Sequence, residues 1–405
     1  MTIGIDASRA FLKRRTGIEE YAYQTIKHLR SVIPGTDTVV LYVRKKLQVT
    51  SYKLQVVIPE IDFELPEHWR VRGIWAPRFW TQVGLSIEML LHPPDVLFVP
   101  AHTVPSIHPA KTVVTIHGLE YEFCPDGYSF WERLYMRASI RFSCRAATTV
   151  ICVSENTKRD VMRLYGVPEE KTRVVYEGYE TNFQFPTRLP DGQVSNFQAN
   201  LNFQPACRTG RFPISKPYLL FIGRLEERKN IVRIIEAFEM LKEKYQIPHT
   251  LVLAGKWGFG ARRIRYKLQA TSYKLDIFLM GYVTEEEKWE LLKNADVFAF
   301  PTLYEGFGIP VLEAQSVGVP VVTSNTSSLP EVAGPPTIPP DEIVLRAGGG
   351  AMFVDPYSVK NIAEGMQKVL SDKALRDGII EKGLKNTERF SWQSCAEKIG
   401  AILRK

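Results

Sequence analysis

The sequence predicts an α/β protein of two domains, on three observations. Its 405 residues exceed what one ordinary hydrophobic core supports and suit two domains of about 150–200 residues each. Short apolar runs typical of buried parallel strands alternate along the chain with segments of helical periodicity. The clearest case is 295–324, where two apolar runs enclose a glycine-rich loop and a helix of about two turns.

Composition narrows the class of protein and of partner. A hydrophobic content of 45% and a charged content of 24% are typical of a globular protein. Since we find no apolar run of about 18 residues and no signal-peptide pattern, we expect a cytoplasmic location. The five scattered cysteines predict reduced thiols. A net charge of +8 favours anionic partners, a nucleotide or a phospholipid surface; nucleic acid is not expected, because no arm or RNP-like motif concentrates the charge.

The stretch YEGFGIPVLEAQSVGVPVV (304–322) organises the second half of the chain. Pro310 suits the first position of a helix, where its missing N–H has no intrahelical partner. Gly318 suits the left-handed position that ends a helix. This places Glu305 in the loop that enters the helix and Glu313 in its first turn.

The same stretch predicts an anion site. A helix N-terminus attracts phosphate, and Gly306 and Gly308 would let a ligand approach the backbone closely. A diphosphate on this turn would place Glu305 and Glu313 where they accept hydrogen bonds from sugar hydroxyls. The alternative is that Glu313 only complements the helix dipole and that the glycines only form a turn.

Glu305 and Glu313, separated by seven residues within YEGFGIPVLEA, resemble the EX7E motif of retaining, nucleotide-sugar-dependent glycosyltransferases of family 4, which have the GT-B fold. The resemblance extends over nearly the whole chain. It implies two Rossmann-like domains with parallel sheets that face across a cleft. The expected parts are an N-terminal acceptor-binding domain (1–180), a linker or insertion (181–216), a nucleotide-sugar-binding domain (217–388) and a C-terminal helix that crosses back (389–405).

The second domain opens with a strand at 218–222 followed by GRLEERKN. Arg224 and Lys229 fall in the strand-to-helix connection, where two cations can reach one diphosphate, each contact contributing roughly 1.5–3 kcal/mol. The segment resembles the family's basic segment, which implies that both residues hold the donor diphosphate. The alternative is ion pairing with Glu226 and Glu227.

In the first half, His117 ends the apolar run of KTVVTIHGLE, at the strand edge where ligands bind in open α/β sheets. It resembles the histidine of the family's TIHD segment, which implies contact with the donor sugar; here Gly118 replaces the usual Asp. Gly17, at an earlier strand-to-helix crossover, resembles a glycine that approaches donor phosphates or acceptor, or else belongs to a solvated basic turn. Ser154 is a good N-cap and resembles a serine near the family's cleft.

The resemblance assigns further roles. The turn from Gly281 to Val283 would hold the nucleobase through its backbone, Glu305 would bind donor-sugar hydroxyls, and Glu313 the ribose diol. The residues expected to bind the donor are Gly17, Arg224, Lys229, Gly281, Val283, Glu305, Gly306, Phe307, Gly308, Ile309 and Glu313. Those expected to act in catalysis are His117, Glu305, Arg224 and Lys229.

One segment, HWRVRGIWAPRFWTQ (68–82), interleaves aromatic rings with guanidinium groups, a composition that suits a membrane interface. The residues concerned are Trp69, Trp75, Phe79 and Trp80, with Arg70, Arg72 and Arg78. We expect this face to touch an anionic bilayer, on the inner face of the cell membrane, and to receive a lipid-linked acceptor. The alternative is ordinary helix packing.

Together these patterns predict a retaining glycosyltransferase that moves a hexosyl unit, mannosyl or glucosyl, from a GDP- or UDP-sugar to a glycan or lipid-linked acceptor in cell-envelope polysaccharide synthesis. No D-x-D sequence occurs, so we expect no metal or other cofactor, with the two cations neutralising the leaving group. Two alternatives remain. One is a non-catalytic nucleotide-sugar or carbohydrate-binding protein, and the other is a sugar-nucleotide epimerase of the same fold.

Overall fold

The computed structural model describes residues 1–12, 15–50, 53–76, 79–179, 217–334 and 346–405. The chain forms two compact units. The first comprises Met1–Gly178, Glu305–Ile309 and Phe390–Lys405, and the second comprises Tyr179–Tyr304 and Pro310–Arg389. The expected linker at 181–216 lies outside the described residues.

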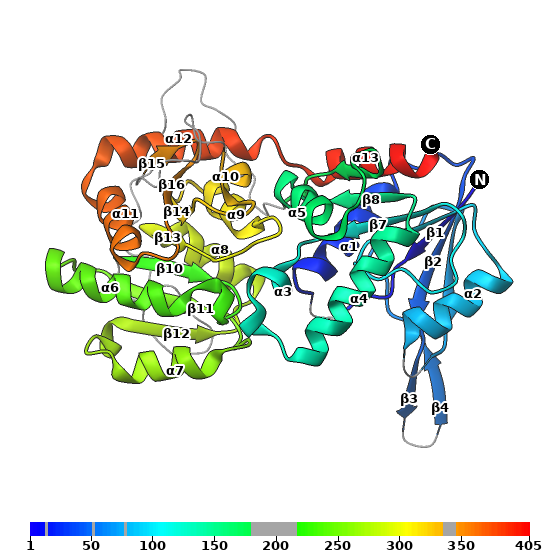
Figure 1. Cartoon of the computed structure of the whole chain (residues 1–405), viewed down its shortest axis with the longest axis horizontal. Helices are drawn as coiled ribbons and strands as arrows, with labels where there is room; N and C mark the ends of the chain where they lie inside the picture. Colours follow the sequence, from blue (N-terminus) through cyan, green and yellow to red (C-terminus); the bar gives the residue numbers. More distant parts are fainter. Residues whose placement is uncertain (13–14, 51–52, 77–78, 180–216, 335–345) are drawn as a thin grey trace. The chain divides into compact units, whose positions relative to one another are not determined.

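The first unit is built on a parallel sheet with the order β5-β2-β1-β6-β7-β8-β9. The order runs one way from β1 to β2 and β5, and the other way from β6 to β9, so β1 and β6 flank a topological switch point. The strands are β1 (Thr2–Asp6), β2 (Thr38–Arg44), β5 (Trp69–Ile74), β6 (Val96–Val99), β7 (Thr112–Ile116), β8 (Thr149–Cys152) and β9 (Thr172–Val174). A separate antiparallel hairpin, β3 (Lys46–Thr50) and β4 (Lys53–Val57), projects beyond this sheet (Figure 1).

Helices connect these strands. They are α1 (Gly17–Leu29), a π-helical segment η1 (Trp80–Leu85) that continues into α2 (Ser86–Leu91), α3 (Glu120–Phe123), α4 (Phe130–Ala146), α5 (Glu155–Tyr165) and α13 (Trp392–Arg404). Ser129 and Ser154 cap α4 and α5, each accepting a hydrogen bond from a backbone N–H of the first turn. The C-terminal helix α13 packs on α1, where Gly400 leaves room for Val32.

The second unit repeats the plan, with the sheet order β12-β11-β10-β13-β14-β16-β15. Its switch point lies between β10 and β13, which pair in parallel. The strands are β10 (Tyr218–Ile222), β11 (Thr250–Ala254), β12 (Ile277–Gly281), β13 (Val297–Phe300), β14 (Val321–Ser324), β15 (Arg346–Gly348) and β16 (Ala351–Val354), of which β15 alone in this sheet is antiparallel to its neighbour. Both units thus confirm the predicted Rossmann-like α/β class.

The helices of the second unit follow the strands in the expected alternation. They are α6 (Ile231–Tyr245), α7 (Ala261–Ala270), α8 (Glu285–Asn294), α9 (Ile309–Ser316), α10 (Leu329–Val332), α11 (Val359–Ser371) and α12 (Lys373–Thr387). Pro310 is the second residue of α9, one place later than predicted. Gly318 has the predicted left-handed conformation, with φ of 72°. The core of this unit is apolar and continuous from β10 to α11.

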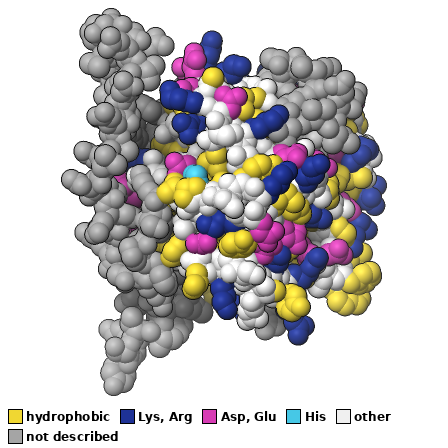
Figure 2. Space-filling view, turned by 90° about the vertical axis from the view of Figure 1, so that its left-hand side faces the viewer, with side chains coloured by type: hydrophobic (Ala, Val, Ile, Leu, Met, Phe, Trp, Pro, Cys, Tyr) yellow, Lys and Arg dark blue, Asp and Glu magenta, His cyan; other side chains and the backbone are white. Residues whose placement is uncertain are grey.

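Charge is mixed on the face drawn in Figure 2. There, among the residues that the structure describes, Lys and Arg side chains are interspersed with Asp and Glu side chains and form no continuous field of one sign. The formal charge of +8 is therefore not focused on this face.

Candidate active site

The expected diphosphate residues of the second unit follow the two strands that flank its switch point. The connection after β10 carries Arg224 and Lys229, and the connection after β13 leads into the glycine-rich stretch. The two connections touch: Leu303 N–H donates to the Arg228 carbonyl at 2.9 Å, and Arg228 Nη1 donates to the Tyr304 carbonyl at 3.0 Å. Because carboxyl ends of parallel strands share one sheet edge, this is where a ligand binds in such a sheet.

The acids beside these cations pair with other arginines. Glu226 pairs with Arg228 at 2.8 Å, and Glu227 with Arg263 of α7. Arg224 is exposed at this edge, whereas Lys229 is buried and its Nζ lies 5.1 Å from the centre of the Phe300 ring. Arg228, which joins the two connections, was not predicted from the sequence.

Glu313 is the fifth residue of α9, so it lies just past the first turn in which it was predicted, and it pairs with Lys288 of α8. Lys288 Nζ is 2.7 Å from Glu313 Oε1 and 2.6 Å from Glu285 Oε2. Burial by itself lowers the pKa of the Lys288 ammonium, but the negative charges of Glu313 and Glu285 outweigh it and raise that pKa above its ordinary value. Lys288 was not predicted from the sequence, although Glu285 and Lys288 stand at the i, i+3 spacing of a helical ion pair.

The expected nucleobase turn leads directly into the same helix. Gly281 ends β12 with φ of 69°, and its carbonyl accepts a hydrogen bond from Gly255 N–H at 2.6 Å. Gly281 is exposed and Val283 half-buried. Thr284 then caps α8 through a reciprocal pair with Glu287. The turn at 281–283 and Lys288 are therefore held by one capped helix.

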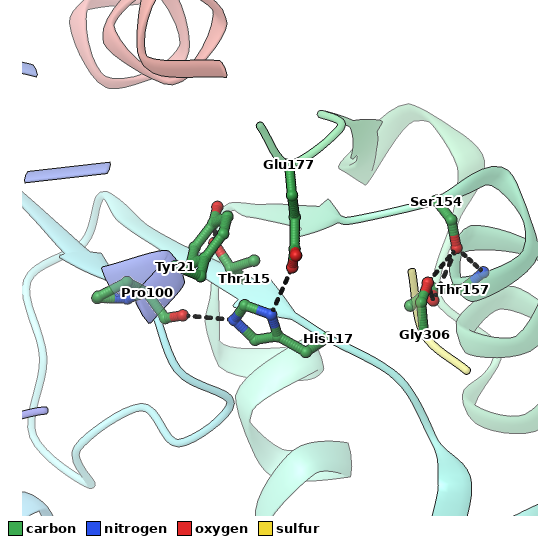
Figure 3. Close-up of polar contacts among 8 residues, drawn as sticks. All are labelled: Tyr21, Pro100, Thr115, His117, Ser154, Thr157, Glu177 and Gly306. Carbon is green, nitrogen blue, oxygen red and sulfur yellow. Dashed lines mark hydrogen bonds and ion pairs between the residues drawn. The ribbon is translucent and has the colours of Figure 1, made fainter. Parts of the chain in front are cut away.

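In the first unit, His117 follows β7, and protein groups contact both of its ring nitrogens. Nδ1 lies 3.1 Å from Glu177 Oε1, and Nε2 lies 2.8 Å from the Pro100 carbonyl oxygen (Figure 3). The Tyr21 ring meets the imidazole edge-on at 4.5 Å between centroids, and its hydroxyl lies 3.1 Å from Thr115 Oγ1. The ring is thus fixed by its neighbours. Sequence reasoning missed Glu177, whose partner lies 60 residues earlier in the chain.

A second histidine lies beside His117. His102 follows β6, at the switch point of the first sheet, and the two imidazole centroids are 5.2 Å apart. Its backbone has a φ of 30°, uncommon for a residue with a side chain, and no protein group bonds its buried Nδ1 among the described residues. Burial, and next the charges of His117 and Arg9, lower the pKa of His102 well below its ordinary value. His102 could have been predicted as a site candidate, because it follows an apolar strand in the sequence.

The segment Glu305–Ile309 belongs to the first unit, where Gly306 is tightly held. Its carbonyl oxygen accepts hydrogen bonds from Ser154 Oγ at 2.7 Å and Thr157 Oγ1 at 3.2 Å (Figure 3). A Cβ at Gly306 would lie 1.5 Å from the His117 carbonyl oxygen. Because Gly306 has no side chain, its backbone can pack directly against the backbone at His117. Ser154 both holds this loop and caps α5.

The neighbours of Gly306 differ in what they offer a ligand. Glu305 is buried, at 7% exposed. The Phe307 ring packs at 5.7 Å from Phe390 and 6.1 Å from Tyr176, so only its backbone remains for the predicted donor contact. Gly308 has φ of 120°, and Ile309 begins α9.

Gly17 is the first residue of α1, with open space around the position of a Cβ. Thr16 caps the helix through a capping box with Glu19, so the helix N-terminus follows the basic loop as predicted. The structure therefore gathers the predicted residues into two sets. Arg224, Lys229, Gly281, Val283 and Glu313 belong to the second unit; Gly17, His117 and 305–309 belong to the first.

Comparison with known proteins decides the family. Residues 15–183 match the family described as Glycosyltransferase Family 4, and residues 208–386 match the family described as Glycosyl transferases group 1. This chain belongs to the group 1, family 4 glycosyltransferases. Among curated relatives, this glycosyltransferase is 29% identical over 285 residues to the O-antigen chain mannosyltransferase B of Escherichia coli, covering 70% of this chain and 68% of the relative.

Solved structures share the GT-B fold of this glycosyltransferase. Sucrose-phosphate synthase from Thermosynechococcus elongatus matches with a TM-score of 0.70 at 18% identity, covering 100% of this chain and 98% of that one. The HepE protein of Anabaena in complex with UDP and glucose matches with a TM-score of 0.67 at 15% identity, covering 100% and 99%. In the part of the chain that the structure describes, no helix is both long and apolar enough to cross a bilayer.

Proposed function

We propose that this glycosyltransferase transfers a hexosyl unit, with retention and without a metal, from a nucleoside-diphosphate sugar to a glycan or lipid-linked acceptor in cell-envelope polysaccharide synthesis. One observation carries the proposal. The connections after β10 and β13 touch through Arg228 at the switch point of the second sheet, and the first of them carries both Arg224 and Lys229. Cations and a helix N-terminus at such an edge suit a diphosphate.

The chemistry follows from that placement. In the transfer, the bond from the sugar's anomeric carbon to the diphosphate oxygen breaks, and negative charge develops on the departing diphosphate. Arg224 and Lys229 neutralise that charge, while Glu305 binds sugar hydroxyls and Glu313 the ribose diol. The acceptor hydroxyl attacks the anomeric carbon from the face that the diphosphate leaves. Its oxygen forms the new glycosidic bond and its proton passes to the departing diphosphate oxygen, while positioning and electrostatics lower the barrier.

The names of similar proteins suggest which sugar and which nucleotide the donor carries. The Escherichia coli relative is named as a mannosyltransferase, and the Anabaena structure holds UDP and glucose. We therefore favour a mannosyl or glucosyl donor, GDP- or UDP-linked. The Escherichia coli relative's name places it in O-antigen chain synthesis, which favours a glycan acceptor here.

The test is transfer by the purified protein. GDP-mannose and UDP-glucose are offered with a glycan acceptor, and NMR reads the anomeric configuration of the first product. Lys229→Ala and Glu305→Ala should each lower kcat/KM by orders of magnitude while circular dichroism stays native, whereas Lys373→Ala, at an exposed lysine of α12, should leave activity unchanged. Binding without transfer or donor hydrolysis would favour the non-catalytic alternative, and formation of an epimeric nucleotide sugar would favour the epimerase.

We also propose that the first unit binds an anionic bilayer, because its exposed apolar side chains gather on a few elements. Trp75 and Phe79 are 57% and 72% exposed, whereas Trp69 and Trp80 are buried at 5% each. The predicted aromatic segment therefore divides into a packed pair and an exposed pair. The exposed pair supports the membrane proposal, whereas the buried pair is packed within the first unit, Trp69 on strand β5 and Trp80 on η1.

Further exposed apolar side chains lie along η1 and α2 and on α4. Together with Trp75 and Phe79 they form a surface that we call the exposed stripe. Val83, Ile87 and Leu90 follow Phe79 at helical spacing, and α4 exposes Phe130, Trp131, Leu134, Tyr135 and Phe142. A hydrogen-bonded chain joins the two helices, since Gln82 donates to the Val104 carbonyl and Val104 N–H donates to Ser143. By contrast α1 and α13, described throughout, expose no large apolar side chain. Exposed arginines flank the stripe on β5 and α4, namely Arg70, Arg72, Arg141 and Arg145.

A further inference from the structure

Lys288 is a nearly buried lysine held between two carboxylates, one of which is Glu313. Its side chain is 14% exposed, and that of Glu313 is 13% exposed. Nζ contacts Glu313 Oε1 at 2.7 Å and Glu285 Oε2 at 2.6 Å, and it lies 5.0 Å from the centre of the Trp289 ring. These contacts fix the ammonium in one place. They also fix one oxygen of the Glu313 carboxylate.

The position of Lys288 in the chain gives this contact a second consequence. The turn at 281–283 runs into α8 through the Thr284 cap, and Lys288 is the fourth residue of that helix. The ion pair between Lys288 and Glu313 therefore ties the expected nucleobase turn to the expected ribose acid. Base and ribose are joined by one covalent bond, so the two protein groups that hold them must stay within a short distance of each other.

The charge of Lys288 matters as well. Glu313 stands in a helix that the proposed function places beside a diphosphate, where a lone carboxylate would repel the ligand. A paired ammonium cancels that charge and leaves the second carboxylate oxygen able to accept hydrogen bonds from two hydroxyls. A lysine that merely tied α8 to α9 would also give these contacts, so the test must separate the two roles.

We propose that Lys288 is a positioning residue that orients the Glu313 carboxylate toward the ribose hydroxyls of the donor nucleotide. The inference rests on the proposed function, in which Glu313 binds the ribose diol. The role can be measured as the ratio of the affinities for a ribonucleotide and for its 2′,3′-dideoxy counterpart, which lacks both ribose hydroxyls. A role confined to stability would change the affinity for both nucleotides equally.

The experiment measures dissociation constants of UDP and GDP, and of their 2′,3′-dideoxy counterparts, by isothermal titration calorimetry on the full chain. For the nucleotide that binds, the wild type should prefer the ribonucleotide by at least about tenfold. Lys288→Met should bring this preference close to one, and Lys288→Arg should retain most of it. Lys293→Met is the matched control: Lys293 lies on the same helix and pairs with Glu290 at 3.8 Å, so it should keep the wild-type preference.

The outcomes separate the two proposals. An undiminished preference in Lys288→Met would overturn the positioning role and leave Glu313 as the ribose acid. A wild type without any preference, or one that binds neither UDP nor GDP, would overturn the ribose role of Glu313 and this inference with it. Should Lys288→Met fail to fold, Lys288→Gln, which keeps a hydrogen-bond donor without the charge, is measured in its place and the same ratio decides.

Discussion

His117 Nδ1 lies 3.1 Å from Glu177 Oε1, and this buried pair joins the end of β7 to the segment after β9. The Pro100 carbonyl contacts the other ring nitrogen at 2.8 Å, so the imidazole has an acceptor on each side. Sequence reasoning placed His117 at the ligand edge of the sheet. The structure adds the groups that set its orientation.

Replacing Glu177 by Ala should leave a buried polar nitrogen of His117 without its partner. An unpaired buried group costs about 1–3 kcal/mol, so urea unfolding should show a loss of that size. Glu177→Gln keeps an acceptor oxygen and should lose less. Equal stability of Glu177→Ala and the wild type would show that the pair does not hold the ring.

His102 should make the protein less stable in mild acid. Its pKa is lowered in the folded state by burial and by His117 and Arg9, so the folded protein binds fewer protons there than the unfolded chain. The free energy of unfolding keeps its full value above the unfolded pKa of His102, about 6.5. As pH falls below about 6.5 the unfolded chain takes up a proton there, so the free energy of unfolding falls by up to about 1.4 kcal/mol per pH unit. Urea unfolding between pH 5 and 7.5 should show this slope in the wild type and a shallower one in His102→Gln. Parallel slopes would contradict the prediction.

Gly306→Ala should destabilise the protein strongly. The new Cβ would lie 1.5 Å from the His117 carbonyl oxygen, a backbone atom, and overpacking of this kind costs about 3 kcal/mol. Gly378→Ala in α12 is the matched control, since its Cβ would meet nothing within 4 Å and alanine favours a helix by roughly 0.5–1 kcal/mol. Thermal unfolding compares the two. A Gly306→Ala protein as stable as Gly378→Ala would mean that the loop is free to move.

Transfer should survive EDTA. The sequence has no D-x-D, and in the proposed function Arg224 and Lys229 bind the diphosphate, so side-chain cations would neutralise the leaving group. Initial rates with and without EDTA, followed by readdition of Mn²⁺, give the measurement. Full loss that Mn²⁺ restores would contradict the metal-independent proposal.

Binding to vesicles should depend on the exposed aromatic side chains of the first unit. Trp75→Ser with Phe79→Ser, and separately Trp131→Ser, should weaken sedimentation with phosphatidylglycerol vesicles severalfold, because each removes exposed apolar area at the interface. Tyr357→Ser, an exposed aromatic of the second unit, is the control. Unchanged binding of the first-unit variants would remove the membrane proposal, and a concentration-dependent change in oligomeric state would assign the stripe to a second copy of the chain.

Much of the fold could be predicted because strand and helix signals are local. The apolar runs at 218–222 and 112–116 are strands, and Gly318 has the left-handed conformation that ends α9. The alternation of Trp and Arg at 68–82 failed to separate Trp69 from Trp75. A sequence pattern names side chains that suit an interface, but packing decides which of them face solvent.

By itself the sequence determined the alternation of strands and helices, the two-domain α/β class, and which residue types follow each strand. Only the tertiary structure decided which partners those residues have. Lys288 with Glu313, Glu177 with His117, and Ser154 with the Gly306 carbonyl are pairs of residues far apart in the chain. The physical reason is that a strand, a helix or its cap forms from near neighbours, whereas these buried polar pairs form only when the fold brings distant segments together.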